Sequence, residues 1–236
     1  MNVKEAVWKE IRHSQSIRID LARGFINTRA LAMYLKRRLL LNASLDAIIS
    51  AIRRYQEEDP FIRAHEAASK VVIGAKLTSN NHIASIMLRK NDEVERLLPR
   101  LSDEGLDIHS DRVRIVRAQK SLKIYLDDKY IEQVKGLFSE KDIIGTDTGL
   151  GEVIVDLREH HWETPGVLNV LSSEIALHNI SIHEMVTCIP EIIFYFSEQD
   201  LMKAYEVLYN LSRAKKDQKS GRQTKRRDRT AAQPQK

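Results

Sequence analysis

An internal repeat constrains the fold of this chain more than any other feature. The apolar segment Leu122 to Leu126 runs into a polar, acidic pair of residues and then into an amphipathic helix, and Ile192 to Phe196 does the same. Around each segment, the hydrophobic pattern predicts the order strand, helix, strand, strand, helix. Such a unit suits a small antiparallel sheet with both helices on one face. The sequence therefore predicts an α+β fold with two copies of one unit.

The elements of the two copies follow from apolar periodicity and turn residues. The first copy is expected to contain strands at 71–77, 83–88, 113–118 and 122–126 and helices at 92–101 and 128–138. The second is expected to contain strands at 153–157, 181–187 and 191–196 and helices at 167–178 and 199–211. The polar run Thr78 to Asn81 predicts a turn. Because neither copy has a convincing final strand, 142–146 is a weak candidate for one, and 71–77 is a candidate for long-range pairing.

The first 58 residues show helical periodicity only, with apolar residues three and four apart. Asn27 and Ser44 are expected to cap two of the helices at their N-termini. Asp59 and Pro60 are expected to close this domain, because proline disfavours helical geometry in the residue before it. We therefore expect a helical domain at 1–58, repeats at 69–145 and 151–212, and a basic tail at 213–236 that is disordered because it is too polar to form a core.

Charge divides the chain in the same way. The formal net charge of +5 combines +5 in residues 1–58, −8 in residues 59–212 and +8 in the tail. No apolar stretch approaches the roughly 20 residues that span a bilayer, so we expect a cytoplasmic protein with no membrane contact. The single cysteine, Cys188, excludes an internal disulfide, and its apolar strand predicts a buried thiol. The tail is expected either to bind polyanions or only to aid solubility.

Common catalytic motifs are missing from the sequence. The chain contains no phosphate-binding glycine loop, no nucleophile elbow and no HExxH zinc motif. The spacing of His160, His161, His178 and His183 matches no standard metal site. We therefore expect a protein that is not an enzyme and that binds neither a cofactor nor a metal.

The segment Glu163-Thr164-Pro165-Gly166-Val167-Leu168, followed after one helix by Asn179-Ile180-Ser181-Ile182, resembles the ligand-sensing ACT domain of amino-acid metabolism. The resemblance covers 151–211, and the first copy, 83–144, matches only in the order of its elements. It implies ferredoxin-like repeats, an edge-to-edge homodimer and an amino-acid effector. Free N–H groups at the start of the helix after Gly166 would attract a carboxylate. The implied ligand-binding residues are Glu163, Thr164, Pro165, Gly166, Val167, Leu168, Asn179 and Ser181.

The resemblance has departures. Asn179 replaces the usual turn glycine, and Ser181 stands where the family often has a ligand-contacting Asn. The first copy lacks the Pro-Gly loop, so that copy is expected to be structural. A sheet-pairing module that binds no small molecule remains the alternative. The whole chain, with a helical N-terminus before ACT-like repeats, is similar to archaeal-type predicted regulators of amino-acid metabolism.

The helical domain contains a candidate helix-turn-helix. Residues 27–40, the break at 41–43 and residues 44–56 look like its second and third helices. On the last helix Ala51 is expected to face outward with the contact residues. The candidate nucleic-acid contacts are Arg29, Lys36, Arg37, Arg38, Ser50, Arg53 and Arg54. A rival register pairs 17–23 with 28–39 through a turn at 24–27.

These observations lead to two functional hypotheses. The first is an amino-acid-responsive transcription regulator whose helical domain binds double-stranded DNA. The second is an allosteric or scaffolding subunit that binds an amino acid and docks on a metabolic enzyme without contacting DNA. A solvated basic face, or an RNA partner, also remains open for the helical domain.

Overall fold

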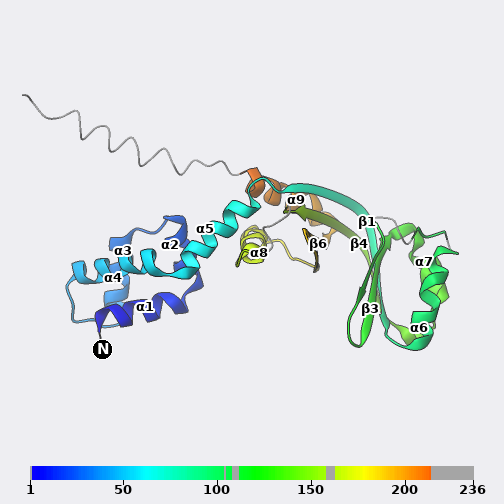
Figure 1. Cartoon of the computed structure of the whole chain (residues 1–236), viewed down its shortest axis with the longest axis horizontal. Helices are drawn as coiled ribbons and strands as arrows, with labels where there is room; N and C mark the ends of the chain where they lie inside the picture. The colour runs from blue at the N-terminus through cyan, green and yellow to red at the C-terminus, as the bar shows by residue number, and fades with distance from the viewer. Residues whose placement is uncertain (1, 104, 108–111, 158–162, 214–236) are drawn as a thin grey trace, which may run out of the picture.

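The computed structural model describes residues 2–103, 105–107, 112–157 and 163–213. The described chain is elongated, with a helical domain at one end and a sheet with its covering helices at the other (Figure 1). Within the described ranges, no helix combines the length and apolar character needed to cross a bilayer. Of the basic tail predicted to be disordered at 213–236, Arg213 belongs to a helix, and residues 214–236 lie outside the described ranges.

The helical domain packs around one apolar core. Its helices are α1 (Val3–His13), α2 (Gln15–Arg23), α3 (Thr28–Arg38) and α4 (Leu45–Glu58). Asn27 and Ser44 cap α3 and α4 as predicted, because each side chain accepts a hydrogen bond from a backbone N–H of the first turn. The core includes Ile11, Leu35 and Ile52, which are completely buried.

A further helix, α5 (Pro60–Val72), connects this domain to the sheet. Asp59 and Pro60 end α4 as predicted, since α4 ends at Glu58 and Asp59 has an extended backbone, but the sequence did not show that Pro60 also begins a helix. Pro60 occupies the first turn of α5, where its missing N–H costs nothing, and the Asp59 side chain accepts a hydrogen bond from Phe61 N at 2.9 Å. The strand predicted at 71–77 is also misplaced, since Val72 ends α5 and the strand begins at Lys76.

The strands form one antiparallel sheet. They are β1 (Lys76–Arg89), β2 (Arg114–Arg117), β3 (Ser121–Asp127), β4 (Ile143–Asp156), β5 (Glu184–Cys188) and β6 (Glu191–Ser197), in the order β2-β3-β1-β4-β6-β5. The turn expected at 78–81 is wrong, because these residues lie inside β1. The hairpin expected at Gln119 and Lys120 is confirmed, since β2 pairs with β3. Long-range pairing of Leu77 is confirmed with Val155 as its partner.

The two central strands, β1 and β4, pair with each other through equivalent positions. β1 and β4 are both 14 residues long, and Ile83 pairs with Leu150 at the middle of each. Just before these partners, His82 (φ 56°) and Gly149 (φ 67°) adopt left-handed backbone conformations at the same position of their strands. The end of β1, with β2, β3 and the start of β4, makes the first unit. The end of β4, with β5, β6 and the start of β1, makes the second unit.

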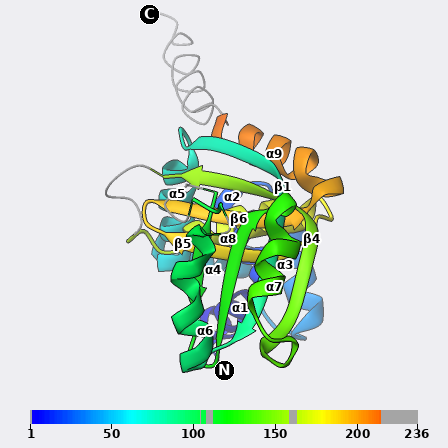
Figure 2. The same cartoon turned by 90° about the vertical axis from the view of Figure 1, so that its right-hand side faces the viewer.

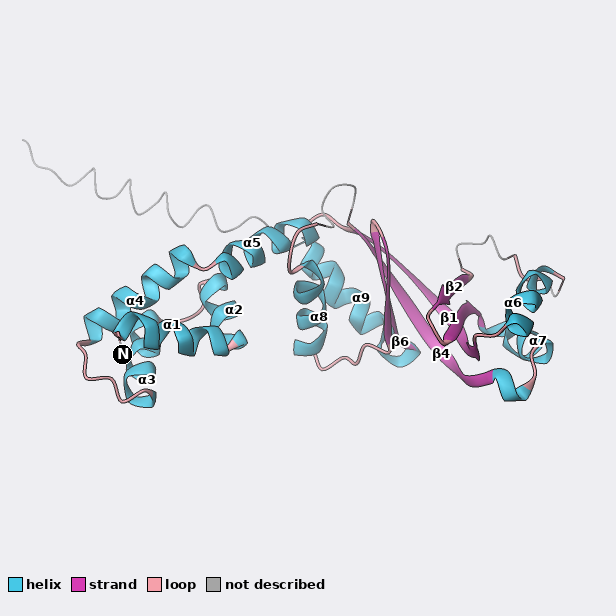
Figure 3. Cartoon of the chain, turned by 60° about the horizontal axis from the view of Figure 1, so that its bottom comes forward, coloured by secondary structure: helices cyan, strands magenta, loops and turns pink. Residues whose placement is uncertain are grey.

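Each unit covers one sheet face with its own helices. In the first unit these are α6 (Asp92–Leu97), continued by the 3₁₀ turn Leu98–Ser102, and α7 (Ile131–Leu137), preceded by the 3₁₀ turn Asp128–Tyr130. In the second unit they are α8 (Val167–Leu177) and α9 (Glu198–Arg213). Figure 3 shows α8 and α9 on one side of the strands and α6 and α7 on the other. In Figure 2 α6 and α7 lie in front of the strands.

The sheet curls so that the uncovered faces of the two units meet. Tyr125 of β3 and Tyr195 of β6 stack with ring centroids 4.0 Å apart, although β1 and β4 separate their strands in the sheet. A flat sheet would hold these strands about 14 Å apart. Both tyrosines are completely buried, together with Ile83, in a core between the units. The two units therefore form four layers, in which the two halves of the sheet face each other and each half is covered by helices on its outer side.

A layer of polar side chains surrounds this tyrosine pair, and we call it the inter-sheet layer. Glu152 is fully buried and accepts hydrogen bonds from Asn80 and Arg114, each at 2.6 Å. On the other side of the tyrosines, Lys123 pairs with Glu184, and the Ser85 hydroxyl donates to Asp147 at 3.1 Å. Hydrogen bonds from Ser85 and His183 and the charge of Lys123 outweigh the effect of burial on Asp147, so its pKa lies below the usual value.

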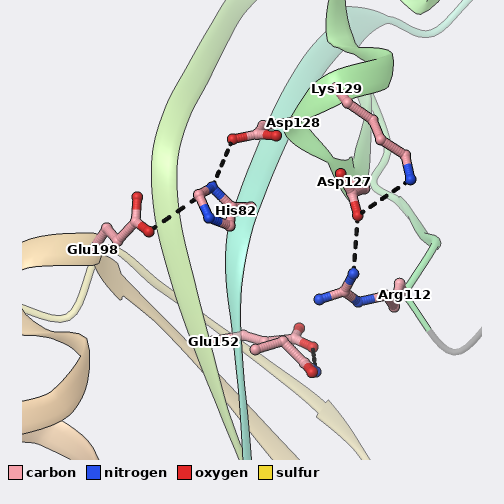
Figure 4. A network of polar contacts seen from close by, with 8 residues as sticks. His82, Arg112, Asp127, Asp128, Lys129, Glu152 and Glu198 are labelled. Atoms are coloured by element: carbon pink, nitrogen blue, oxygen red, sulfur yellow. Dashed lines mark hydrogen bonds and ion pairs between the residues drawn. The ribbon is translucent and has the colours of Figure 1, made fainter.

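A second polar cluster lies at the edge of the layer (Figure 4). The His82 imidazole Nδ1 is 3.2 Å from Asp128 at the start of the first unit's helical segment and 3.9 Å from Glu198 at the start of α9. His82 therefore contacts corresponding positions of both units. Beside it, Asp127 binds Arg112 at 2.9 Å and Lys129 at 3.9 Å.

The edge strand β5 departs from two predictions. Its first residue is Glu184, not Ser181 as expected from the apolar pattern. Cys188, predicted to be buried, is exposed. The physical reason is that β5 is an edge strand. It has a neighbouring strand on one side only, so its other side is open to solvent.

Candidate functional sites

The proposed ligand loop leads into α8, whose N-terminus has no side-chain cap. Side chains cap α1 to α6, whereas α7 and α8 have no side-chain cap. The N-cap of α8 is Gly166, which has a left-handed backbone (φ 93°) and no side chain to accept a hydrogen bond. Among the described residues, no side chain accepts a hydrogen bond from the first N–H groups of α8, which carry the positive end of the helix dipole. This end of α8 suits a carboxylate.

A buried acceptor lies in the first turn of the same helix. The Asn169 Oδ1 atom is buried and has no hydrogen-bond partner among the described residues. Such an atom is costly unless a donor reaches it. Among the neighbouring predicted residues, Glu163 and Pro165 are exposed, Thr164 is half-buried, Val167 is buried, and Leu168 is 41% exposed. The start of α8 therefore has backbone N–H donors, and a buried side-chain acceptor without a partner among the described residues lies in the same turn.

The remaining predicted ligand residues lie at the opposite end of α8. Asn179 follows the helix in a left-handed conformation (φ 55°), which asparagine tolerates and which explains how it replaces a glycine here. Its N–H donates to Ala176 O at 2.9 Å, and the next turn leads to the exposed Ser181. Eleven residues of helix span about 16 Å. Gly166 and Ser181 therefore do not meet within one chain.

Helix α5 covers the start of α8, which the sequence did not reveal. A Cβ atom at Gly166 would lie 3.7 Å from the Ala68 side chain of α5, and Ala68 and Val167 belong to the same core. Further along α8, Glu174 forms an ion pair with Arg23 of α2 at 3.2 Å. The start of α8 is thus in contact with α5, and α8 is linked to the helical domain by the ion pair between Arg23 and Glu174.

The first unit closes the corresponding position with its own residues. Asn91 caps α6 by accepting a hydrogen bond from Val94 N at 2.9 Å. Its side-chain amide also donates to the buried Asp142 at 2.8 Å. Both polar ends of the Asn91 side chain are therefore satisfied, and this helix start offers a ligand less than α8 does.

In the helical domain, all the predicted nucleic-acid contacts are exposed: Arg29, Lys36, Arg37, Arg38, Ser50, Arg53 and Arg54. Arg38 is held by an ion pair with Glu10 of α1, whose hydrogen bond and charge raise the pKa of the guanidinium. The prediction that Ala51 faces outward is wrong. Ala51 is only 6% exposed, and its carbonyl accepts a hydrogen bond from the Trp8 indole at 2.9 Å.

The two helix-turn-helix registers differ in their turns. Helices α3 and α4 are separated by residues 39–44, which is longer than the break expected at 41–43. Helices α2 and α3 are separated by residues 24–27, and Gly24 ends α2 with φ 72°. A turn of three or four residues that contains glycine is typical of a helix-turn-helix. The turn geometry therefore favours the rival register.

Among the described residues, no group of three or more His, Cys, Asp and Glu side chains is arranged to hold a metal ion. His178 caps its own helix end through Glu174 O, at 2.9 Å, and His183 lies 3.3 Å from Asp147. His160 and His161 lie outside the described residues.

Comparison by sequence finds no matching protein-family model and no matching curated protein. Several solved structures are similar in fold. Aspartate kinase from Clostridium acetobutylicum matches at 13% identity with a TM-score of 0.48, over 59% of this chain and 34% of that one. The regulatory subunits of aspartate kinase from Thermus thermophilus and Thermus flavus match at 10% and 11% identity with TM-scores of 0.47 and 0.48.

The coverage of these structures differs. This chain spans about a third of the Clostridium enzyme but 98% and 95% of the two Thermus subunits, which in turn cover 59% and 57% of it. All three identities are below 25% and all three TM-scores below 0.5. At this level the similarity concerns the fold and does not extend to individual residues.

Proposed function

We propose that this protein is an amino-acid-responsive regulator whose second unit binds a small α-amino acid and whose helical domain binds double-stranded DNA. The start of α8 is the observation that carries the ligand half. Its uncapped N–H groups suit a carboxylate, and the unpaired Asn169 Oδ1 suits an ammonium donor. A zwitterionic amino acid supplies both groups at once. The resemblance of 163–168 to the ACT loop supports the same ligand class.

The proposal includes a homodimer. Because α8 separates Gly166 from Asn179 and Ser181, the ligand is placed between the Pro-Gly loop of one chain and the 179–181 turn of a second. The ligand then stabilises one arrangement of the two chains in proportion to its differential affinity. The contact of α5 with the loop carries that change toward the helical domain.

A thermal-shift screen of the full chain against the twenty amino acids tests the ligand site. We expect one or a few amino acids to raise the melting temperature, and a flat response to all twenty would contradict the proposal. Gly166→Asp and Gly166→Asn form a matched pair, because Asp and Asn both tolerate left-handed backbone. The Asp variant places a tethered carboxylate at the helix start. The shift should survive in the Asn variant and disappear in the Asp variant.

Gel-shift measurements on a chain ending at Arg213 test the DNA half without the basic tail. We expect binding to a random-sequence duplex at low salt that weakens steeply as salt increases. The exposed Phe25, which is 78% exposed in the turn between α2 and α3, favours a second candidate, an enzyme-docking subunit. Absence of duplex binding at low salt would exclude the first candidate and leave the second.

A further inference from the structure

We infer that α3, and not α4, is the helix that contacts duplex DNA, and that Leu40 beyond its last turn supplies an apolar contact to the bases. This inference rests on the proposed DNA binding and assigns it to one surface. The surface, which we call the α3 face, consists of Arg29, Met33, Lys36, Arg37 and Leu40.

The charge of the two helices separates them. Helix α3 carries Arg29, Lys36, Arg37 and Arg38 and no acidic residue. Helix α4 carries Arg53 and Arg54 but also Asp46, Glu57 and Glu58. Among the described residues, no carboxylate lies within ion-pair distance of Arg29, Lys36 or Arg37. A polyanion therefore gains more from α3, whose three unpaired cations can neutralise phosphates.

Packing gives the same assignment. Helix α4 contacts both α1 and α3, and it buries Ile48, Ala51, Ile52 and Tyr55. Helix α3 buries only Leu31, Ala32 and Leu35 and follows the short turn that begins with Gly24. The helix after a short glycine turn is the one that a helix-turn-helix presents to the major groove.

Leu40 is the anomaly on this face. It is 89% exposed and has a left-handed backbone (φ 49°). Its N–H donates to Arg37 O at 3.3 Å, and the N–H of Leu41 donates to Lys36 O at 3.0 Å, so it occupies the left-handed position of a Schellman cap. Gly24 and Asn179 occupy the equivalent positions after α2 and α8. Leucine is strained where glycine and asparagine are not.

The strain and the exposure of Leu40 point to a contact that is made outside the chain. One shallow hollow contains both apolar side chains and two cations, and it is lined by Met33, Lys36, Arg37, Leu40, Leu41 and Asn42. In a duplex groove, the cations reach phosphates and the apolar side chains reach thymine methyl groups and base edges. A second copy of the chain is disfavoured here, because two α3 faces would oppose their basic residues.

Salt-dependent binding distinguishes the two kinds of contact on the α3 face. The chain ending at Arg213 is titrated onto a fluorescent random-sequence duplex at several salt concentrations. Lys36→Ala with Arg37→Ala should weaken binding and reduce the slope of log K against log salt by about two, one for each phosphate that is no longer neutralised. Leu40→Gly should weaken binding about tenfold with the slope unchanged, because an apolar contact releases no counterions.

Three controls keep the result interpretable. Leu40→Gly should keep or raise the melting temperature, because glycine relieves the backbone strain, so weaker binding cannot reflect a failure to fold. Leu177→Ala removes another leucine that is 69% exposed, and Arg53→Ala with Arg54→Ala removes the cations of α4. Leu177→Ala should leave duplex affinity close to that of the unchanged chain, and the α4 double variant should weaken binding and lower the salt slope less than the α3 double variant does.

The outcomes separate the inference from the proposed function. Duplex binding that survives the α3 substitutions but is abolished in the α4 variant overturns the inference and leaves DNA binding intact. Binding unaffected by Leu40→Gly overturns the role of Leu40. If the unchanged chain binds no duplex, the proposed function itself fails. If it binds only single-stranded RNA or an acidic peptide through this face, the inference fails as well.

Discussion

The two units of the sheet share one topology but differ at the helix that follows their first strand. In the first unit, Asn91 caps α6 and binds the buried Asp142, so this helix start is complete in itself. In the second unit, Gly166 leaves the start of α8 without a side-chain cap, and Asn169 Oδ1 has no partner among the described residues. The same fold therefore serves as a closed support in one unit and as an open candidate site in the other.

A second difference lies in the inter-sheet layer. Glu152 on β4 and Ser85 on β1 occupy the same position of their strands, and both are completely buried. Glu152 holds a buried ion pair with Arg114, whereas Ser85 makes one neutral-to-charged hydrogen bond with Asp147. The two residues occupy equivalent positions but make different interactions. We therefore expect the half of the layer around Glu152 to contribute more to stability than the half around Ser85.

The largest expected effect is at Glu152. Glu152→Ala should lower the free energy of unfolding by about 3 to 5 kcal/mol, because it leaves Arg114 without its buried partner. Ser85→Ala should cost only about 1 kcal/mol. Urea unfolding of each variant measures both values.

A double variant tests the cause of that destabilisation. If the cost arises from the unpaired Arg114, Glu152→Met with Arg114→Met should recover most of the stability, since apolar side chains can replace a buried ion pair. Equal destabilisation by Glu152→Ala and Ser85→Ala would contradict the inequality of the two halves.

An intermediate effect is expected where α9 approaches β4. A Cβ at Gly151 would lie 2.6 Å from Leu201 Cδ2, whereas the first unit has the buried Ala84 at the same strand position. Gly151→Ala should therefore cost about 1 to 3 kcal/mol by overpacking. Gly145→Ala on the same strand, where no atom lies within 4 Å of the added Cβ, is the control. Thermal or urea unfolding would contradict the close approach if the two variants were equally destabilised.

Sequence periodicity predicted helices in the first 58 residues and in both units, because each buries one continuous stripe, but it missed α5. It failed at Thr78 to Asn81, where four polar residues indicated a turn but lie within β1. That part of β1 pairs only with β4, since β3 pairs from Ile83 onward, so it forms an edge of the second unit where polar residues are tolerated. Local pattern cannot show which strand segment becomes an edge.

The sequence predicted some parts of the candidate sites and missed others. The Pro-Gly loop could be recognised, because proline and glycine before a helix have a local signature. The cover that α5 provides was not predicted, because Pro60 correctly indicated the end of α4 but did not reveal that a new helix begins at the same residue. The preferred helix-turn-helix register suffered from a similar limit: the inward stripe of α4 was clear, but a clear stripe signals burial, and Ala51 proved to be part of it.

The smallest expected effect is at His82, where the two units join. Substitutions there separate the effect of backbone strain from that of side-chain contacts. His82 and Gly149 share a left-handed conformation, so glycine is the natural residue at this position and His82 is strained. Its contacts with Asp128 and Glu198 involve side chains that are 61%, 37% and 39% exposed, and exposed ion pairs contribute little. His82→Gly should therefore change the free energy of unfolding by less than about 1 kcal/mol.

His82→Ala is the matched variant, since alanine removes the same imidazole but keeps the backbone strain. We expect it to be less stable than His82→Gly by roughly 1 kcal/mol, the reverse of the usual order of alanine and glycine. Urea unfolding at low salt measures the difference. If both variants are destabilised by the same, larger amount, the imidazole contacts with the two carboxylates dominate, and His82 stabilises the junction by linking the two units despite its backbone strain.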